Sequence, residues 1–361
     1  MKAFQKPKRT FCSKPERKIE NMKRLSIFNK IVFAINLVVV VLLLVACAVP
    51  YLTFENLPFL SFLSLGVPVL VGANTLFFLY WLIQGKRQML YSLAILVFGY
   101  FVLGTFIKLS FTRDKFAKED LKILSYNVHG FKKKPGIKRI TLYKGVQDLV
   151  LEEQPDIICF QEVGYRMDKD FMNYPYHHLQ RIYTGKKAHL GIFSKYPIIK
   201  SEIINFPNSI NNGSYADIVY KNDTIRVYNI HMQSLGITPG TGVIRSKSTD
   251  QLYEGVANSF IQQLQQAKMI AEHKASSPYK TLVCGDFNNT QFSNVYHQIK
   301  GDMQDSFIEE GSGYGRTFNF LQIPLRIDFL LADESFEVRG HKNYDLNYSD
   351  HFPVMASFRL K

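Results

Sequence analysis

The chain has 361 residues, of which 47% are hydrophobic, and it carries 44 Lys and Arg against 30 Asp and Glu, a formal net charge of +14. This length and composition exclude a disordered or fibrous protein and allow one or two domains. A basic excess of this size is typical of proteins that bind nucleic acid or an anionic surface. The excess lies at the amino terminus, because residues 1–118 hold 16 Lys or Arg and 4 Asp or Glu, whereas the remaining residues hold 28 and 26.

The first 30 residues form a basic tail with ten Lys or Arg, and three long apolar stretches follow it, at residues 31–52, 58–84 and 89–108. At 1.5 Å per residue, the 22 residues of the first stretch span a hydrocarbon core of about 30 Å. Buried helices of a soluble protein rarely run so long without a polar face. The sequence therefore predicts three transmembrane helices.

Basic residues flank these stretches unevenly. The tail is rich in them, residues 53–57 contain none, and Lys86 and Arg87 separate the second stretch from the third. Because cytoplasmic flanks carry the positive charge, the amino terminus is expected in the cytoplasm, and three crossings place the carboxyl-terminal domain outside it. We therefore expect an integral protein of a bacterial inner membrane, in contact with the lipid bilayer. A nucleic-acid-binding arm is the alternative interpretation of the tail, but the apolar stretches directly after it favour the membrane.

Residues 110–120 are predicted as a polar linker, and residues 121–361 are enough for one large α/β domain. Short β-rich runs predict strands at 121–128, 156–160, 188–193, 225–230, 281–284 and 327–331. Helical periodicity lies between them, at residues 142–149 and 256–271. Cys159 and Cys284 lie within two of the apolar runs, so we expect them to be buried free thiols.

Polar side chains collect at six strand ends, five of which belong to the strands predicted above. They are Asn127, Glu162, His231, Asp286 with Asn288, Asp328, and Asp350 with His351. Each residue alone has an ordinary explanation as a turn, a helix cap or a surface group. Rigid strands, however, hold side chains that the following loops leave open to a ligand. Six strand ends of this kind therefore predict one shared site.

The chemistry of this set favours one class of reaction. Many oxygen donors without a thiolate favour a hard divalent cation such as Mg²⁺ or Mn²⁺. Such a metal neutralises a phosphate ester while a carboxylate activates water and an imidazolium faces the phosphoryl oxygen. The sequence contains no Gly-x-Ser-x-Gly, no Gly-rich loop ending in Lys-Ser/Thr and no His-Glu-x-x-His. Acyl transfer, use of nucleoside triphosphates and zinc proteolysis therefore have no support.

The ordered motifs SYNVHGF, PDIICFQEV, GIFSKYPI, IHMQS, GDFNNT, RIDFLL and SDHFPV resemble those of the endonuclease/exonuclease/phosphatase family. This family includes nucleases similar to pancreatic deoxyribonuclease, apurinic endonucleases, inositol-polyphosphate 5-phosphatases and bacterial sphingomyelinases. The resemblance covers essentially all of residues 121–361 and none of the apolar stretches. It implies a four-layer α/β sandwich, with two mixed β-sheets packed face to face and helices outside, and metal-dependent hydrolysis of a phosphoester.

The resemblance also implies roles for the acidic and amide residues. Glu162 would be the principal metal ligand, with Asn127 and Asp350 as further ligands or as their supports. Asp286 would orient and activate the attacking water. Asn288 would hold Asp286 and touch the phosphate.

The histidines complete the implied machinery. His351 would contact or protonate a phosphate oxygen, and Asp328 would fix its tautomer and keep it cationic. His231 stands where the nuclease branch has a phosphate-contacting histidine. Arg245 and Arg316 lie in segments that usually shape the substrate pocket of the family, so we expect one of them to contact phosphate.

The substrate stays open, because loops and not core residues divide the family. An endonuclease-like enzyme needs a basic groove, which the nearly neutral domain supports weakly. A lipid-headgroup phosphodiesterase of the sphingomyelinase type would benefit directly from being held at a bilayer. A catalytically inactive membrane protein that only binds phosphate ligands is the second alternative. The sequence predicts no protein partner.

Overall fold

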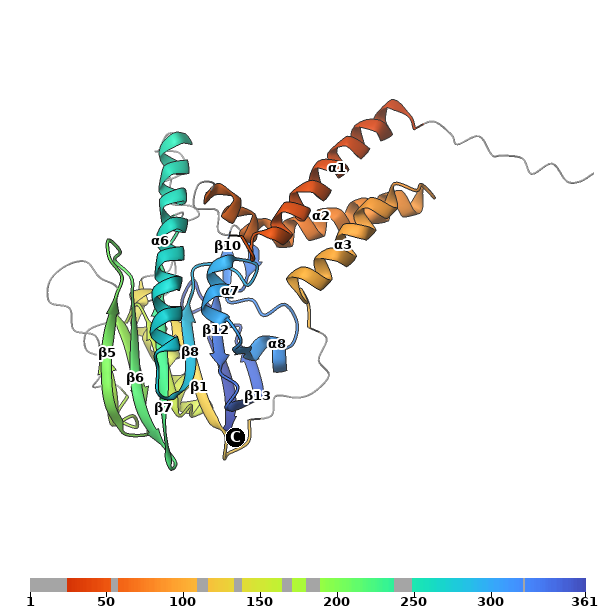
Figure 1. Ribbon diagram of the computed structural model, residues 1–361. Coiled ribbons are helices and arrows are strands. Elements are labelled where there is room, and N and C mark those ends of the chain that lie inside the picture. The colour runs from red at the N-terminus through yellow and green to blue at the C-terminus, as the bar shows by residue number, and fades with distance from the viewer. Residues whose placement is uncertain are drawn as a thin grey trace, which may run out of the picture.

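The computed structural model describes residues 25–52, 58–108, 116–132, 138–163, 171–179, 189–236, 249–320 and 322–361. Most of the predicted basic tail and residues 110–115 of the predicted linker lie outside these ranges. The described chain forms a helical module, which projects from one end, and a larger two-sheet domain (Figure 1).

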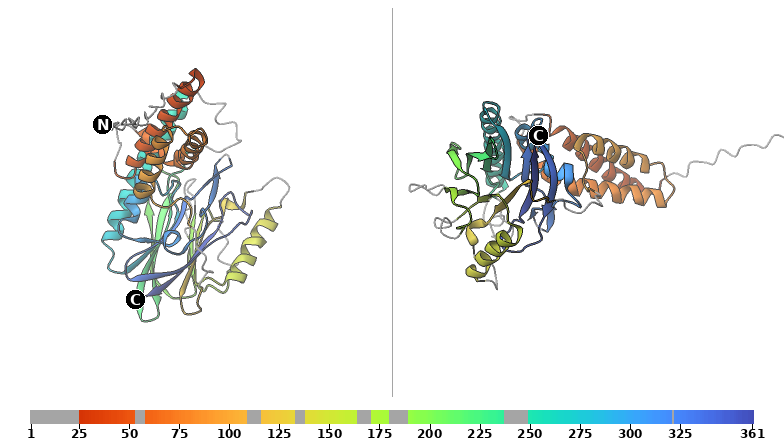
Figure 2. Two further views of the ribbon diagram at one scale, coloured as in Figure 1. Left: turned by 90° about the vertical axis from the view of Figure 1, so that its right-hand side faces the viewer. Right: turned by 90° about the horizontal axis from the view of Figure 1, so that it is seen from below.

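The helical module contains α1 (Ile27–Ala48), the short 3-10 helix η1 (Pro58–Phe62), α2 (Leu63–Ile83) and α3 (Met89–Leu103). The three α-helices lie side by side (Figures 1 and 2). Ser26 begins α1, because its Oγ accepts a hydrogen bond from the backbone N–H of Asn29 at 3.2 Å. The helix ends just before Pro50, which cannot donate the next backbone hydrogen bond.

Two helices of the described chain are long and apolar enough to cross a membrane, Ile27–Ala48 and Leu60–Ile83. The prediction of three transmembrane helices is wrong on this criterion. At 15 residues, α3 is about 22 Å long and falls short of a hydrocarbon core of about 30 Å. Its early end has a local cause, since Gly104 follows it with a φ of +80°, a conformation that stops the helix before the predicted boundary at 108.

The carboxyl-terminal domain contains two six-stranded sheets. In spatial order, the first consists of β13 (Phe336–Asn343), β14 (Val354–Leu360), β1 (Leu121–Asn127), β2 (Ile157–Gln161), β4 (Leu190–Ser194) and β3 (Tyr176–Leu179). The second consists of β5 (Ile198–Asn205), β6 (Asn212–Tyr220), β7 (Asp223–His231), β8 (Lys280–Asp286), β12 (Asp328–Ala332) and β9 (Gln304–Asp305). Both sheets are mixed, because β1 runs parallel to β2 and β7 runs parallel to β8, whereas the other pairs are antiparallel.

Helices cover the outer faces of both sheets, and Figure 2 shows the layers. The first sheet carries α4 (Arg139–Glu153), and the second carries α6 (Thr249–Ala275) and α7 (Asn294–Lys300). The other elements in the described residues are η2 (His129–Phe131), α8 (Ser306–Glu310) and the hairpin of β10 (Phe318–Phe320) and β11 (Ile323–Leu325). This arrangement confirms the predicted α/β architecture of two mixed sheets flanked by helices.

The core between the sheets is a cluster of apolar side chains that contains no charged residue. Ile157 from the first sheet packs in one cluster with Val227 from the second. Cys159 and Cys284 belong to the same cluster and are buried free thiols, as predicted. Central strands such as β2 (IICFQ) and β12 (DFLLA) are buried on both faces and are apolar up to their polar end residues.

The strand register brings the predicted site residues together at one end of the sandwich. His231 is paired with Asp286 across β7 and β8, and Asp286 is paired with Asp328 across β8 and β12. In the first sheet, Asn127 is paired with Gln161, the residue before Glu162. Both sheets therefore place polar side chains at the same end of the sandwich.

Candidate active site

Asp286 occupies the middle of this end of the sandwich and is almost completely buried, with 1% of the residue exposed. Its Oδ1 accepts a hydrogen bond from the backbone N–H of Asn288 at 2.8 Å. Its Oδ2 accepts from Nδ2 of Asn127 at 3.0 Å and from Nδ2 of Asn288 at 3.3 Å. Asn288 adopts a φ of +49°, and this left-handed backbone closes the turn that points its amide at the carboxylate.

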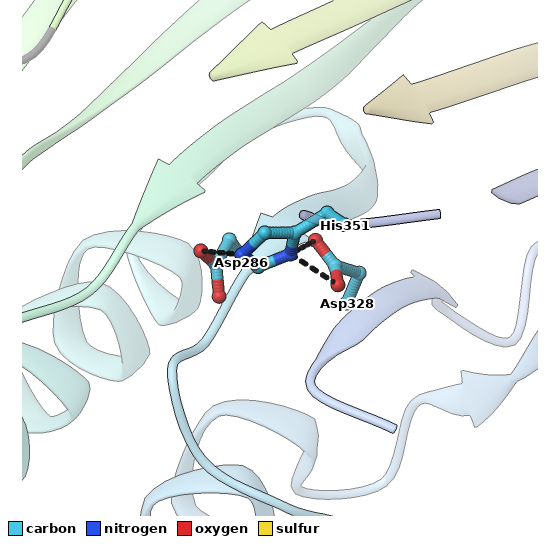
Figure 3. A group of neighbouring side chains, drawn as sticks. All are labelled: Asp286, Asp328 and His351. Carbon is cyan, nitrogen blue, oxygen red and sulfur yellow. Dashed lines mark hydrogen bonds and ion pairs between the residues drawn. The ribbon is translucent and has the colours of Figure 1, made fainter. Parts of the chain in front are cut away.

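Two histidines face Asp286 as well. Nε2 of His231 and Nε2 of His351 each lie 3.5 Å from Oδ2 of Asp286. The other nitrogen of His351, Nδ1, lies 2.9 Å from Oδ2 of Asp328, so the imidazole bridges two carboxylates (Figure 3). Thr317 fixes Asp328 in turn, because its Oγ1 accepts a hydrogen bond from the backbone N–H of Asp328 at 3.1 Å.

For both His351 and Asp286, the strongest charge interaction with a neighbouring side chain shifts the pKa in the direction opposite to the effect of burial. Burial lowers the pKa of His351, but the negative charges of Asp328 and Asp286 outweigh it and raise the pKa to about 10. Burial also raises the pKa of Asp286, and the electrostatic interactions with His351 and His231 reduce that rise. His351 is therefore an imidazolium at neutral pH, placed against a carboxylate whose basicity is enhanced.

Glu162 and Asn127 lie on the side of the first sheet. Nδ2 of Asn127 lies 3.5 Å from Oε1 of Glu162 and also reaches Asp286, so one amide joins the two carboxylates. Glu162 has a φ of +54°, a strained conformation for a residue with a side chain. This backbone turns the carboxylate of Glu162 toward Nε2 of His231, at 3.8 Å.

Asp350 completes the predicted set, and it brings a residue that the sequence reasoning missed. Its Oδ2 lies 3.1 Å from Nδ1 of His129, which also lies 3.9 Å from Oε2 of Glu162. Burial works against ionisation of Asp350, but the hydrogen bond from His129 and the charge of His351 hold its pKa below the ordinary range. His129 sits two residues beyond β1, in η2, so the histidine of the SYNVHGF motif was the available signal.

Two groups of side chains have the chemistry to hold a divalent cation. Asp286, Asp328 and His351 offer ligand atoms within 4.8 Å of one another. They satisfy one another, however, because both nitrogens of His351 face carboxylates. The side chain of Glu162 is a quarter exposed, and that of Asp350 is about two-fifths exposed. Both carboxylates face Nδ1 of His129. Their open carboxylate oxygens fit a hard divalent cation better.

Of the two predicted arginines, the structure describes Arg316, which is engaged outside this cluster. Nη2 of Arg316 donates to Oδ1 of Asp345 at 2.6 Å, and its guanidinium lies 4.0 Å from the ring centre of Phe352. Arg245 lies outside the described residues. Phosphate contact by either arginine stays a prediction.

One further polar residue, Gln161, holds the two sheets together beneath the site. Its Nε2 donates to Oδ1 of Asn229 in β7 at 2.7 Å, and Nδ2 of Asn229 donates back to the backbone oxygen of Phe160 at 2.9 Å. Gln161 and Asn229 are completely buried. The glutamine of the QE motif therefore has a structural role beside the proposed ligand Glu162.

This combination of fold and site defines the class of two-sheet phosphate-ester hydrolases. Residues 124–351 match the model of the Endonuclease/Exonuclease/phosphatase family, and residues 29–106 match the model of a domain of unknown function. The chain belongs to the endonuclease/exonuclease/phosphatase family, as its motifs predicted, and is a phosphate-ester hydrolase.

Solved structures share the fold of the carboxyl-terminal domain. D. rerio TDP2 complexed with a single-strand DNA product is 15% identical, with a TM-score of 0.51, over 67% of this chain and all of that one. A family protein from Bacteroides thetaiotaomicron is 19% identical, with a TM-score of 0.50, over 67% and 98%. The human Nocturnin catalytic domain with bound sulfate is 14% identical, with a TM-score of 0.50, over 69% and 97%. No curated protein matches the chain.

Proposed function

We propose that this protein is a membrane-anchored phosphodiesterase that depends on a divalent cation and cleaves its substrate by in-line attack of water. One observation carries the proposal: Oδ2 of Asp286 lies 3.5 Å from Nε2 of both His231 and His351. A buried base and two imidazoles thus converge on one point, where a water molecule and a phosphate group would meet.

Asp286 is the proposed base. Asn127 and Asn288 hold its two oxygens, which leaves the carboxylate one orientation. Because burial raises its pKa, the ionised carboxylate accepts a proton from water more readily than an exposed aspartate would.

His351 is the proposed donor to a phosphate oxygen. Its Nδ1 is engaged by Asp328, so the proton on Nε2 points toward Asp286 and the reaction centre. Its raised pKa keeps that proton in place at neutral pH. His231 approaches the same point from β7 and would hold another phosphate oxygen.

A divalent cation, for which we propose Mg²⁺ or Mn²⁺, would be held by Glu162 and Asp350, and it would supply charge neutralisation for the phosphate. Asn127 lies between this pair and Asp286, since its amide contacts Glu162 and Asp286. Asn127 would thereby fix the position of the metal ligand Glu162 relative to the base Asp286.

The polarity of the helical module supports membrane anchoring. Its interior holds polar groups: Nδ2 of Asn36 donates to Oγ of Ser92 at 2.8 Å, and Nε1 of Trp81 donates to Oδ1 of Asn36 at 3.0 Å. Its surface is apolar, with exposed residues such as Val38 on α1 and Leu76 on α2. Polar groups inside and apolar groups outside are typical of helices that pack in lipid.

The direction of the helices supports an extracytoplasmic catalytic domain. The amino-terminal end of α1 lies by the end of α2, where Nδ2 of Asn29 donates to Oε1 of Gln84 at 3.0 Å. Lys30 lies in the first turn of α1, and Lys86 and Arg87 follow shortly after α2. These helix ends point away from the two-sheet domain (Figure 1). The opposite end of α1 adjoins the domain, so α1 alone separates the basic residues from the catalytic residues. Because α2 returns the chain to the basic side, this topology requires the 15-residue α3 to cross as well, in a locally thinner bilayer. We therefore propose a cytoplasmic amino terminus in a bacterial inner membrane.

The proposal leaves two phosphodiester substrates, a nucleic acid and a lipid headgroup. D. rerio TDP2 was solved with a single-strand DNA product, which favours an endonuclease-like activity by analogy of fold. The exposed apolar surface of the helices favours a substrate in the bilayer. An inactive protein that binds phosphate ligands is the remaining alternative.

The full-length protein in detergent tests the proposal with bis(p-nitrophenyl) phosphate. Hydrolysis is expected with added Mg²⁺ or Mn²⁺ and is expected to stop with EDTA. D286N and H351Q should abolish it, whereas D148N, a matched change on the exposed face of α4, should not. Binding of phosphate without any turnover would identify the inactive alternative.

A further inference from the structure

A small apolar pocket lies where the helical module meets the catalytic domain. It encloses about 70 Å³, room for about two or three methylene groups, each close in size to a water molecule. Its walls are mostly apolar and include Phe62, Leu65, Leu235, Phe318, Phe320 and Leu325. Two of these residues, Phe62 and Leu65, belong to η1 and α2, so the proposed membrane anchor supplies one wall.

Buried hydrogen bonds fix that wall to the loop after the GDFN motif. Oγ of Ser64 donates to Oδ1 of Asn289 at 3.0 Å, and Oγ1 of Thr290 donates to the backbone oxygen of Ser64 at 2.9 Å. Phe292 packs in the apolar cluster of the helical module and stacks on Phe106, with ring centres 5.0 Å apart. The junction is therefore a packed interface, and the start of α2 has a defined place beside the site.

The same pocket adjoins the proposed machinery on two sides. Asn288 is part of its lining, and its amide also holds Asp286. On the other side, the ring of Phe318 lies 4.9 Å from the ring of His351, centre to centre. A phosphate ester held at Asp286 and His351 would thus have one of its ester groups directed toward Phe62, Leu65 and Phe318.

We propose that this pocket is a specificity subsite that takes the first carbons of a hydrocarbon chain, so that the substrate is a lipid phosphoester drawn from the bilayer. The inference rests on the proposed hydrolase function and names its substrate class. The apolar lining recognises hydrocarbon and offers few groups that could pair with a sugar or a base. One wall is the beginning of a helix long enough to cross the membrane, which puts the pocket next to lipid.

Full-length protein in detergent tests the subsite with methyl, butyl and octyl p-nitrophenyl phosphate. In each reaction the oxygen of water bonds to phosphorus and p-nitrophenolate leaves. Each methylene that enters the pocket should raise kcat/KM about fourfold. We expect a rise of at least about tenfold from methyl to butyl, and little further rise to octyl, because the pocket is short. Simple partition into detergent would instead continue to favour octyl.

Variants locate the effect. The double variant F62A/L65A should reduce the butyl-to-methyl ratio about tenfold, whereas I83A, an exposed change at the other end of α2, should leave this ratio as in the wild type. An unchanged ratio in F62A/L65A would overturn the subsite. A larger loss for thymidine 5′-p-nitrophenyl phosphate than for the butyl ester would overturn it in favour of a nucleoside.

Calorimetry with methylphosphonate and butylphosphonate separates the subsite from the catalytic proposal, because it needs no turnover. If butylphosphonate binds more tightly than methylphosphonate and F62A/L65A loses this difference, the subsite is supported. This holds even if no ester is hydrolysed, because absence of hydrolysis would contradict only the proposed hydrolase function. Turnover without dependence on chain length, together with equal binding of the two phosphonates, would overturn the subsite alone.

Discussion

Nδ1 of His351 lies 2.9 Å from Oδ2 of Asp328, and both side chains are almost completely buried. The buried carboxylate fixes both the orientation and the charge of the imidazole. His351 then faces Asp286 through Nε2. A carboxylate that takes no direct part in bond making thus controls the group proposed to contact the phosphate.

This pair makes folding stability depend on pH. The pKa of His351 rises to about 10 in the folded protein, above its ordinary 6.5, so protonation stabilises the fold. That contribution is complete below pH 6.5 and is lost as the pH rises toward 10. In EDTA, the difference in Tm between wild type and H351Q should shrink across this window. Parallel curves for the two proteins would contradict the assignment.

D328N should shift the alkaline limb of the pH profile of kcat to lower pH. The neutral amide cannot hold the positive charge on His351, so the proton on Nε2 is lost earlier. At neutral pH we expect a fall in kcat of about 10²-fold or more. D148N serves as the matched surface control. A lowered kcat with an unmoved alkaline limb would assign Asp328 a purely structural role.

D286N should separate activity from stability. Loss of the proposed base should lower kcat by about 10³-fold. Because burial raises the pKa of Asp286, its ionised form costs folding stability at neutral pH, and the amide removes that cost. The new NH2 group would, however, face the amide donors of Asn127 and Asn288, which works against that gain. Thermal unfolding should therefore show a Tm within a few degrees of that of the wild type. A marked fall in Tm would mean that the lost activity reflects misfolding.

E162Q should weaken the response to metal. A carbonyl oxygen replaces one carboxylate oxygen, so the Mg²⁺ concentration for half-maximal activity should rise about tenfold or more. E309Q, an exposed change on α8, is the matched control. Equal metal dependence in E162Q and the wild type would exclude Glu162 as a ligand.

Q161L should destabilise the domain, because Asn229 would lose its buried donor. We expect a loss of about 1–3 kcal/mol in the free energy of unfolding. The double variant Q161L/N229L removes both polar partners and should lose less than the sum of the single changes. Additive losses would show that the two side chains act independently.

Much of the site was predictable from the sequence because of how the strands are buried. The strands β2 and β12 are apolar up to their polar end residues, and β1, β7 and β8 are rich in apolar residues, so the polar side chains at their ends stood out. By contrast, β6 carries Asp217, which is buried only because Nε of Arg226 in β7 contacts its Oδ1 at 2.6 Å. A pairing of that kind is formed by the fold and leaves no periodic pattern.

The missed features have local causes. His129 lies in a turn with a φ of +47°, and its partner Asp350 comes from the far end of the chain. The end of α3 depends on the conformation of Gly104, whereas hydropathy alone extends the helix to 108. The contact of Ser64 with Asn289 joins the helical module to the catalytic domain, two segments that hydropathy alone predicts to be separate.

The stacking of Phe292 on Phe106 bears on how this enzyme can be prepared. Phe292 is 1% exposed only because the helical module covers it. A fragment trimmed to the two-sheet domain would present this ring and its apolar neighbours to water, and it would leave Thr290 without the backbone oxygen of Ser64. Such a fragment should self-associate, and substrate profiles measured on it would describe a site with one side removed.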